Sequence, residues 1–155
     1  MRLRTERLES AGKDGSEEEI VIRYRTRTEE VEKLESAVRR LLSAEKGITL
    51  YREDTEFYLP SEEVLFFETD DRKVVAHTAK ELFYAKDNLS ALEQTLPYQF
   101  IRASKSCIVN AAAVFSIRRG ITGVSEIGFR DTKKTAFMSR SYYRSFMDKM
   151  EEIRR

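Results

Sequence analysis

Apolar and polar positions succeed one another at short intervals between Gly47 and Asn88. Five segments of six or seven residues are rich in β-branched and aromatic side chains: ITLYRE, TEFYLP, VLFFET, KVVAHTA and ELFYAK. Such segments, separated by polar turn-forming residues, are typical of strands joined in hairpins. The sequence therefore predicts an antiparallel, mostly β domain, α+β overall once its short helices are counted.

Helical spacing of apolar residues interrupts this pattern at three places. Residues 28–46 begin at Thr28, a suitable N-cap, and carry a stripe formed by Val31, Leu34, Val38, Leu41 and Leu42. Residues 88–96 place three leucines on one helical face, and residues 139–155 predict a closing helix with Ser139 as its N-cap. The segment EIVIRYR, Glu19–Arg25, alternates and predicts a strand. We expect an N-terminal extension, residues 1–46, and a second domain, residues 47–155.

The stretch FIRASKSCIVN, Phe100 to Asn110, combines strand-like ends with a polar centre. Further β-like segments follow it, AAVFSIRR, GVSEIGFR and TKKTAFM. Four basic clusters fall at turns, at a strand end or at the start of the last helix: Arg72 with Lys73, Lys105, Arg118 with Arg119, and Arg140 with Arg144. At such positions side chains project freely from a rigid scaffold. Arg and Lys at such positions suit contacts with phosphates and guanine edges.

Charge is segregated along a chain whose formal net charge is only +1. Residues 1–69 hold 12 Lys and Arg against 17 Asp and Glu, a net of −5, whereas residues 70–155 hold 16 against 10, a net of +6. Between Pro97 and Met147, nine basic residues face only Glu126 and Asp131. Such segregation favours an anionic polymer as partner, the alternative being scattered surface charge.

Catalytic and metal chemistry have little support in the sequence. The chain has one histidine, His77, and one cysteine, Cys107, so it cannot assemble a tetrahedral nitrogen and sulfur site. Cys107 lies among strand-forming apolar residues without an activating context, and the six glycines form no phosphate loop. We expect no enzymatic activity, no metal, no cofactor and no small-molecule substrate. A single cysteine, a charged N-terminus and no long apolar run lead us to expect a soluble, cytoplasmic protein.

The motifs FIRASKSCIVN, AAAVFSI and FMSRSYYRSF together closely resemble the LytTR DNA-binding domain of bacterial transcriptional regulators. VLFFETDDRKVVAHT and NLSALEQTL are similar, in order and spacing, to the elements that precede those motifs in the family. The resemblance spans about Ile48 to Met150. It implies a compact, mostly β domain that inserts loops into successive major grooves on one side of double-stranded DNA, at direct repeats in promoters.

The resemblance also implies particular residues. Lys105 and Arg140 are the expected base-edge contacts, Arg72 is the third, and Ser139 and Arg144 are expected at phosphates. In chain order, the implied DNA-binding residues are Arg72, Lys73, Arg102, Ser104, Lys105, Ser106, Ser139, Arg140 and Arg144. Asn110 is expected to be structural, bonding loop backbone. Many members carry His where this chain has Ser104, which leaves the base preference open.

Members of this family commonly carry a phosphoacceptor receiver domain. The residues before Gly47 offer too few elements for one, so we expect a short, receiver-less, response-regulator-like member. Short relatives are often associated with a small membrane protein, which makes such a protein a candidate partner. The helix 28–46 is expected either to pair with its copy in a homodimer or to pack against the β domain.

Two alternative functions follow from the basic face. The chain could be a non-enzymatic regulatory module that binds an acidic protein, or one that binds RNA. An RNA-binding sheet would need exposed aromatic side chains. Phe66 and Phe67, like Phe83 and Tyr84, are adjacent pairs, so one of each pair is expected to face outward from its strand.

Overall fold

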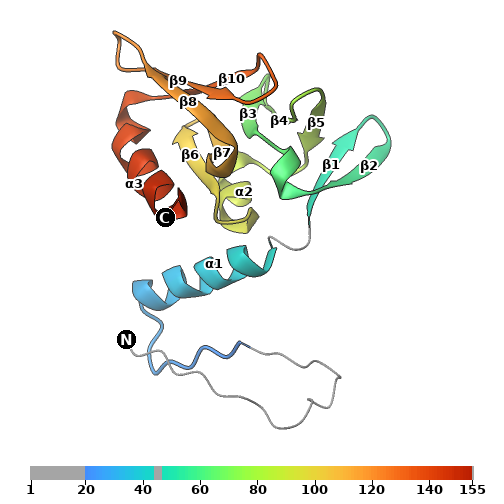
Figure 1. Ribbon diagram of the computed structural model, residues 1–155. Helices are drawn as coiled ribbons and strands as arrows, with labels where there is room; N and C mark the ends of the chain where they lie inside the picture. The colour runs from blue at the N-terminus through green and yellow to red at the C-terminus, as the bar shows by residue number, and fades with distance from the viewer. Residues whose placement is uncertain (1–19, 44–46, 155) are drawn as a thin grey trace. The chain divides into compact units, whose positions relative to one another are not determined.

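The computed structural model describes residues 20–43 and 47–154, and the chain divides into two units between residues 35 and 36. The second unit is built mainly from antiparallel strands (Figure 1). Its strands are β1 Ile48–Arg52, β2 Thr55–Leu59, β3 Phe66–Asp70, β4 Lys73–His77, β5 Leu82–Ala85, β6 Phe100–Ser104, β7 Cys107–Asn110, β8 Val114–Arg119, β9 Ser125–Phe129 and β10 Thr135–Met138.

These strands form two sheets. The larger has seven strands in the order β2-β1-β5-β4-β3-β7-β6, and the smaller has three in the order β10-β9-β8. Short helices lie between or after the strands: α2 is Leu89–Thr95 and α3 is Tyr143–Arg154. The prediction of a mostly β domain with short helices is confirmed.

The larger sheet is covered on both faces, and β3 shows why its sequence is so apolar. Phe66 packs in the cluster with Ile127, Met138 and Phe146, which come from the smaller sheet and α3. Its neighbour Phe67 points the other way, into the cluster with Leu89 and Leu92 of α2. A strand buried on both faces reads as a continuous apolar run rather than as an alternation.

This double covering corrects one expectation. Phe66 and Phe67 are 2% and 0% exposed, so neither faces outward. In the second pair the prediction is confirmed, because Phe83 is buried and Tyr84 is exposed.

The N-terminal prediction is correct for the helix and wrong for the strand. Helix α1 spans Glu29–Ser43, and the Thr28 hydroxyl accepts a hydrogen bond from Val31 N at 3.4 Å, as expected of an N-cap. Residues 20–25 belong to no strand, and Glu19 and residues 44–46 lie outside the described residues. A strand needs partners for its backbone groups, and the alternation in this segment supplies none within the described chain.

The closing helix begins later than predicted. Residues 140–142 form a 3-10 turn, and α3 starts only at Tyr143. Ser139 precedes the turn, but its side chain caps no backbone N–H. The Ser139 hydroxyl instead lies 3.4 Å from that of Ser141.

Candidate nucleic-acid interface

The polar centre of FIRASKSCIVN is the tip of the β6–β7 hairpin. Ile101 pairs with Val109, and Ser104 pairs with Cys107 after a bulge, which leaves Lys105 and Ser106 as the turn. The anchoring residues are buried, with Phe100, Ile101, Ile108 and Val109 each at most 3% exposed. A rigid, buried hairpin therefore fixes the direction in which the exposed Lys105 projects.

Arg102 holds this turn from within. Its Nε donates to the Ser104 carbonyl oxygen at 2.7 Å, and its Nη2 donates to the Lys105 carbonyl oxygen at 2.6 Å. Its Nη1 forms an ion pair with the Glu93 carboxylate at 3.1 Å, and the side chain is 14% exposed. The planar guanidinium thus ties the turn to α2, a three-way contact that an ammonium group cannot reproduce.

The first loop, which carries Arg72, is a two-residue hairpin turn between β3 and β4. Asp70 pairs with Lys73, so Asp71 and Arg72 alone form the turn. Their φ angles are +44° and +67°, as a type I′ turn requires at both central positions. Such turns favour Asn-Gly, and a bulky residue such as Arg at positive φ is strained. Strain of this kind is commonly retained at functional sites.

Two backbone hydrogen bonds connect three loops that carry the implied DNA-binding residues: the first loop, the β6–β7 turn, and the third loop, which is the segment between β10 and α3. Thr69 N, at the end of β3, donates to Ser106 O in the β6–β7 turn at 2.9 Å. Ser139 N, after β10, donates to Ala103 O at the end of β6 at 3.0 Å. The β6–β7 turn therefore lies between the other two loops, and all three open at the same edge of the domain.

Exposed cations project from each loop. Arg72, Lys105, Arg140 and Arg144 are exposed, and their side chains form no hydrogen bond or ion pair with another described residue. Other basic residues of this region are engaged. Arg118 pairs with Glu126 at 3.0 Å, and Lys134 Nζ donates to the Thr78 and Glu81 carbonyl oxygens at 2.8 Å. Burial lowers the pKa of Lys134.

Two serines complete the β6–β7 turn. Ser106 N donates to the Ser104 hydroxyl at 3.2 Å, and the two hydroxyls lie 3.4 Å apart. Both side chains are at least partly exposed. They can offer short hydrogen-bond donors beside Lys105, whereas a histidine at position 104 would reach further.

Asn110 is structural, as expected. The side chain is 1% exposed, and its amide nitrogen donates to the Ser61 and Val64 carbonyl oxygens at 3.1 and 2.9 Å. Its amide oxygen accepts from Ala112 N at 3.2 Å. Asn110 thus holds the chain that enters β3 against the chain that leaves β7.

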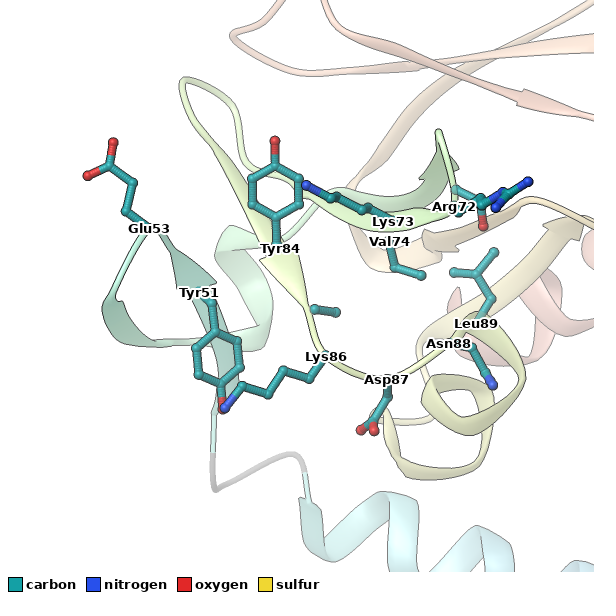
Figure 2. Close-up of a pocket in the computed structure, with 12 residues that line it drawn as sticks. Tyr51, Glu53, Arg72, Lys73, Val74, Tyr84, Lys86, Asp87, Asn88 and Leu89 are labelled. Carbon is teal, nitrogen blue, oxygen red and sulfur yellow. The ribbon is translucent and has the colours of Figure 1, made fainter.

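A pocket of about 560 Å³ adjoins the first loop, and its lining includes Arg72, Lys73 and one cation that the sequence did not single out, Lys86. Figure 2 shows Lys73 extending toward Tyr84, while Arg72 points away from it. The Lys73 ammonium lies 5.6 Å from the Tyr84 ring centroid, and the Lys86 ammonium lies 4.0 Å from that of Tyr51. Lys86 follows β5, which ends beside the start of β4, so only the strand pairing brings it to this edge.

The lone cysteine and histidine lie elsewhere in the strands. Burial raises the pKa of Cys107 to about 12, so its thiol stays protonated near neutral pH. His77 stacks on Phe66 with 4.1 Å between ring centroids, and its Nε2 lies 2.8 Å from a Glu68 carboxylate oxygen. The surroundings of both residues are those of side chains with a structural role.

Comparison with known proteins agrees with this geometry. The LytTr DNA-binding domain family matches residues 54–151, more than half of the chain. The chain belongs to this family. A solved LytTr DNA-binding domain from Bacillus cereus has the same fold, with a TM-score of 0.62 and 24% identity, over 68% of this chain and 96% of that one.

Relatives named as uncharacterized HTH-type transcriptional regulators occur in Staphylococcus aureus strains NCTC 8325 and COL. Each is 32% identical to this chain over 88 residues, which are 57% of this chain and 59% of the relative. The match thus covers less than two thirds of the relatives' length. Within the described residues, strands separate the three α-helices along the chain, so no two consecutive α-helices form a helix-turn-helix. None of these helices is long and apolar enough to cross a membrane.

Proposed function

We propose that this protein is a sequence-specific, double-stranded DNA-binding transcriptional regulator that acts without catalysis. The β3–β4 turn, the β6–β7 turn and the segment between β10 and α3 enter the major groove from one side of the duplex. Membership of the LytTr DNA-binding domain family supports DNA as the partner. The names of the S. aureus relatives support a role in transcription.

One observation carries the proposal: two backbone hydrogen bonds hold three loops at one edge, and each loop offers an exposed cation. Loops held at a fixed spacing can match the regular spacing of phosphates and base edges, whereas mobile loops would lose conformational entropy on binding. We assign Lys105 and Arg140 to base edges, and Arg72 as the third such contact. Arg can bind guanine O6 and N7 with two parallel hydrogen bonds.

The remaining residues hold the protein on the phosphate backbone. Ser139 and Arg144 are assigned to phosphates, and so are Lys73, Ser104 and Ser106, which lie beside the base-reading residues. Arg102, with its guanidinium engaged by Ser104, Lys105 and Glu93, positions the central turn and touches DNA at most through its edge. Phosphate contacts set register and affinity, and base contacts set preference.

Arg140→Ala tests the proposal directly. On a cognate duplex obtained by selection from a random pool, we expect a loss of about 1–3 kcal/mol, roughly 5- to 150-fold, in a mobility-shift titration. Random duplex should be affected much less. Arg130→Ala is the matched control, since Arg130 lies at the β9–β10 turn, at the opposite end of the smaller sheet. Wild-type affinity of Arg140→Ala for the cognate site would contradict the assignment.

The RNA alternative has less support. Of the four aromatic residues considered for an RNA-binding sheet, Phe66, Phe67 and Phe83 are buried and only Tyr84 is exposed. An acidic protein partner remains the second reading of the basic edge. Salt-dependent binding to random duplex DNA distinguishes the two, because it is expected for a DNA-binding protein and not for a module that recognises an acidic protein.

A further inference from the structure

None of the residues assigned to DNA contacts lies in the β8–β9 hairpin, but the tip of this hairpin contacts the third loop. The hairpin ends with Arg119 paired to Ser125, and residues 120–124 form its loop. Gly120 N donates to Val124 O at 2.9 Å, and Gly123 N donates to Gly120 O at 3.1 Å, which close the loop on itself. Figure 1 shows this hairpin, in orange, beside the red start of α3.

Gly123 lies directly against the side chain of Arg140. A Cβ atom at position 123 would stand 2.9 Å from Arg140 Cδ, 3.2 Å from its Cγ and 3.3 Å from its Cβ. The strand register explains this contact. Met138 pairs with Ser125 in antiparallel strands, so the residues after Met138 run alongside the residues before Ser125. The backbone of Gly123 therefore packs against the aliphatic part of the Arg140 side chain. The exposed guanidinium of Arg140 has no partner among the described residues.

A second contact joins the same two segments. The Arg119 guanidinium carbon lies 4.4 Å from the ring centroid of Tyr143, the first residue of α3. Tyr143 in turn packs against the core cluster that contains Phe146. Cation–π contacts of this kind hold their two partners in register. The end of the hairpin thus contacts the third loop at Arg140 and the start of α3 at Tyr143.

We propose that the tip of the β8–β9 hairpin is a positioning element for Arg140, with Gly123 limiting the path of its stem and Arg119 fixing the hairpin on α3. The inference rests on the proposed function, since it concerns how Arg140 reads a base. A long side chain that is aligned before binding loses less rotamer entropy on contact, so the gain falls on the cognate site. Neither residue needs to touch DNA.

The test is a double-mutant cycle between Gly123→Ala and Arg140→Ala, read as the ratio of affinities for cognate and random duplex. A methyl group at position 123 displaces the stem, and we expect Gly123→Ala to lower this ratio about tenfold. In the Arg140→Ala background the same change should alter it less than about twofold, because the two nearest obstructed atoms, Cγ and Cδ, are gone. Gly47→Ala is the control, being another positive-φ glycine, at +70°, whose added Cβ would meet the Leu59 backbone and, among the described residues, no part of Arg140.

Arg119→Met provides a second measurement, because it removes the contact with Tyr143 and leaves Gly123 unchanged. Arg119 is exposed, so the substitution should be tolerated by the fold. It should lower the specificity ratio in the same direction, again only when Arg140 is present. An equal effect of Gly123→Ala with and without Arg140, or an equal effect of Gly47→Ala, would overturn the inference while leaving Arg140 as a base contact. An unchanged ratio for Arg140→Ala alone would overturn the assignment of Arg140 and the inference with it.

Discussion

Arg72 combines an unfavourable backbone conformation with an exposed cation, so its two contributions can be separated. Its φ of +67° suits glycine, and Arg72→Gly should raise the free energy of unfolding by about 0.5–1 kcal/mol, the relieved strain less the added chain entropy. The same variant should bind cognate DNA more weakly. Thermal or urea unfolding should show increased stability, and a DNA titration should show reduced affinity.

Asp71→Gly is the matched control, since Asp71 shares the turn with φ of +44° and carries no positive charge. It should stabilise the fold without weakening DNA binding. If Arg72→Gly kept full DNA affinity, the strained arginine would have no binding role.

His77 supplies a pH dependence that is easy to isolate because it is the only histidine. Burial lowers its pKa below the ordinary 6.5, with Glu68 and Asp70 opposing the shift and Lys134 adding to it. The unfolded chain therefore takes up a proton at higher pH than the folded protein does. Stability should be fully present above about pH 6.5 and fall as the pH drops below it.

Urea unfolding of the wild type and of His77→Gln between pH 7.5 and 5.5 measures the contribution of His77 to the pH dependence of stability. The wild type should lose stability across the interval relative to the variant, in which the group is absent. A wild type that gained stability toward pH 5.5 would mean that the ion pair with Glu68 outweighs burial.

At the scale of elements, the β6–β7 hairpin depends on a side chain that is mostly hidden. Arg102→Lys keeps the charge but cannot bind two carbonyl oxygens and the Glu93 carboxylate together. We expect a loss of about 1–3 kcal/mol of folding stability and a reduced preference for cognate over random DNA. Calorimetry and competition titrations would measure the two effects.

Arg118→Lys is the appropriate comparison for this variant. Arg118 is 79% exposed and pairs with Glu126 across the β8–β9 hairpin, so the change should stay within about 0.5 kcal/mol. Equal behaviour of the two variants would show that Arg102 does not organise the turn.

At the scale of the whole molecule, a nearly neutral chain presents a locally basic edge. Binding should therefore weaken steeply with salt even though the formal net charge is +1. Lys73 and Arg144 are the two cations assigned to phosphates, so the slope of log affinity against log salt concentration should be about −1.8 per bound protomer. Arg144→Ala should make it about 0.9 less steep. Fluorescence anisotropy between 50 and 300 mM salt would measure both, and a flat dependence would contradict a phosphate-binding edge.

Much of the molecule could be predicted from local pattern. Strand positions, the three helices, the polar break at residues 102–106 and the structural role of Asn110 follow from periodicity, turn chemistry and a specific motif. The predicted strand at 19–25 was wrong because alternating polarity indicates which side chains could be buried but does not supply a neighbouring strand for pairing. The late start of α3 escaped prediction because a capping residue can also precede a 3-10 turn.

The sequence by itself determined the family, the fold class and the residue types that suit DNA, because these depend on local spacing and on the order of motifs along one chain. Only the tertiary structure decided which basic residues are exposed and which are engaged, as with Arg140 against Arg102 and Lys134. It also brought Lys86 to the first loop and Gly123 to Arg140. Strand register sets such meetings, and register follows from the packing of both sheet faces rather than from any single segment.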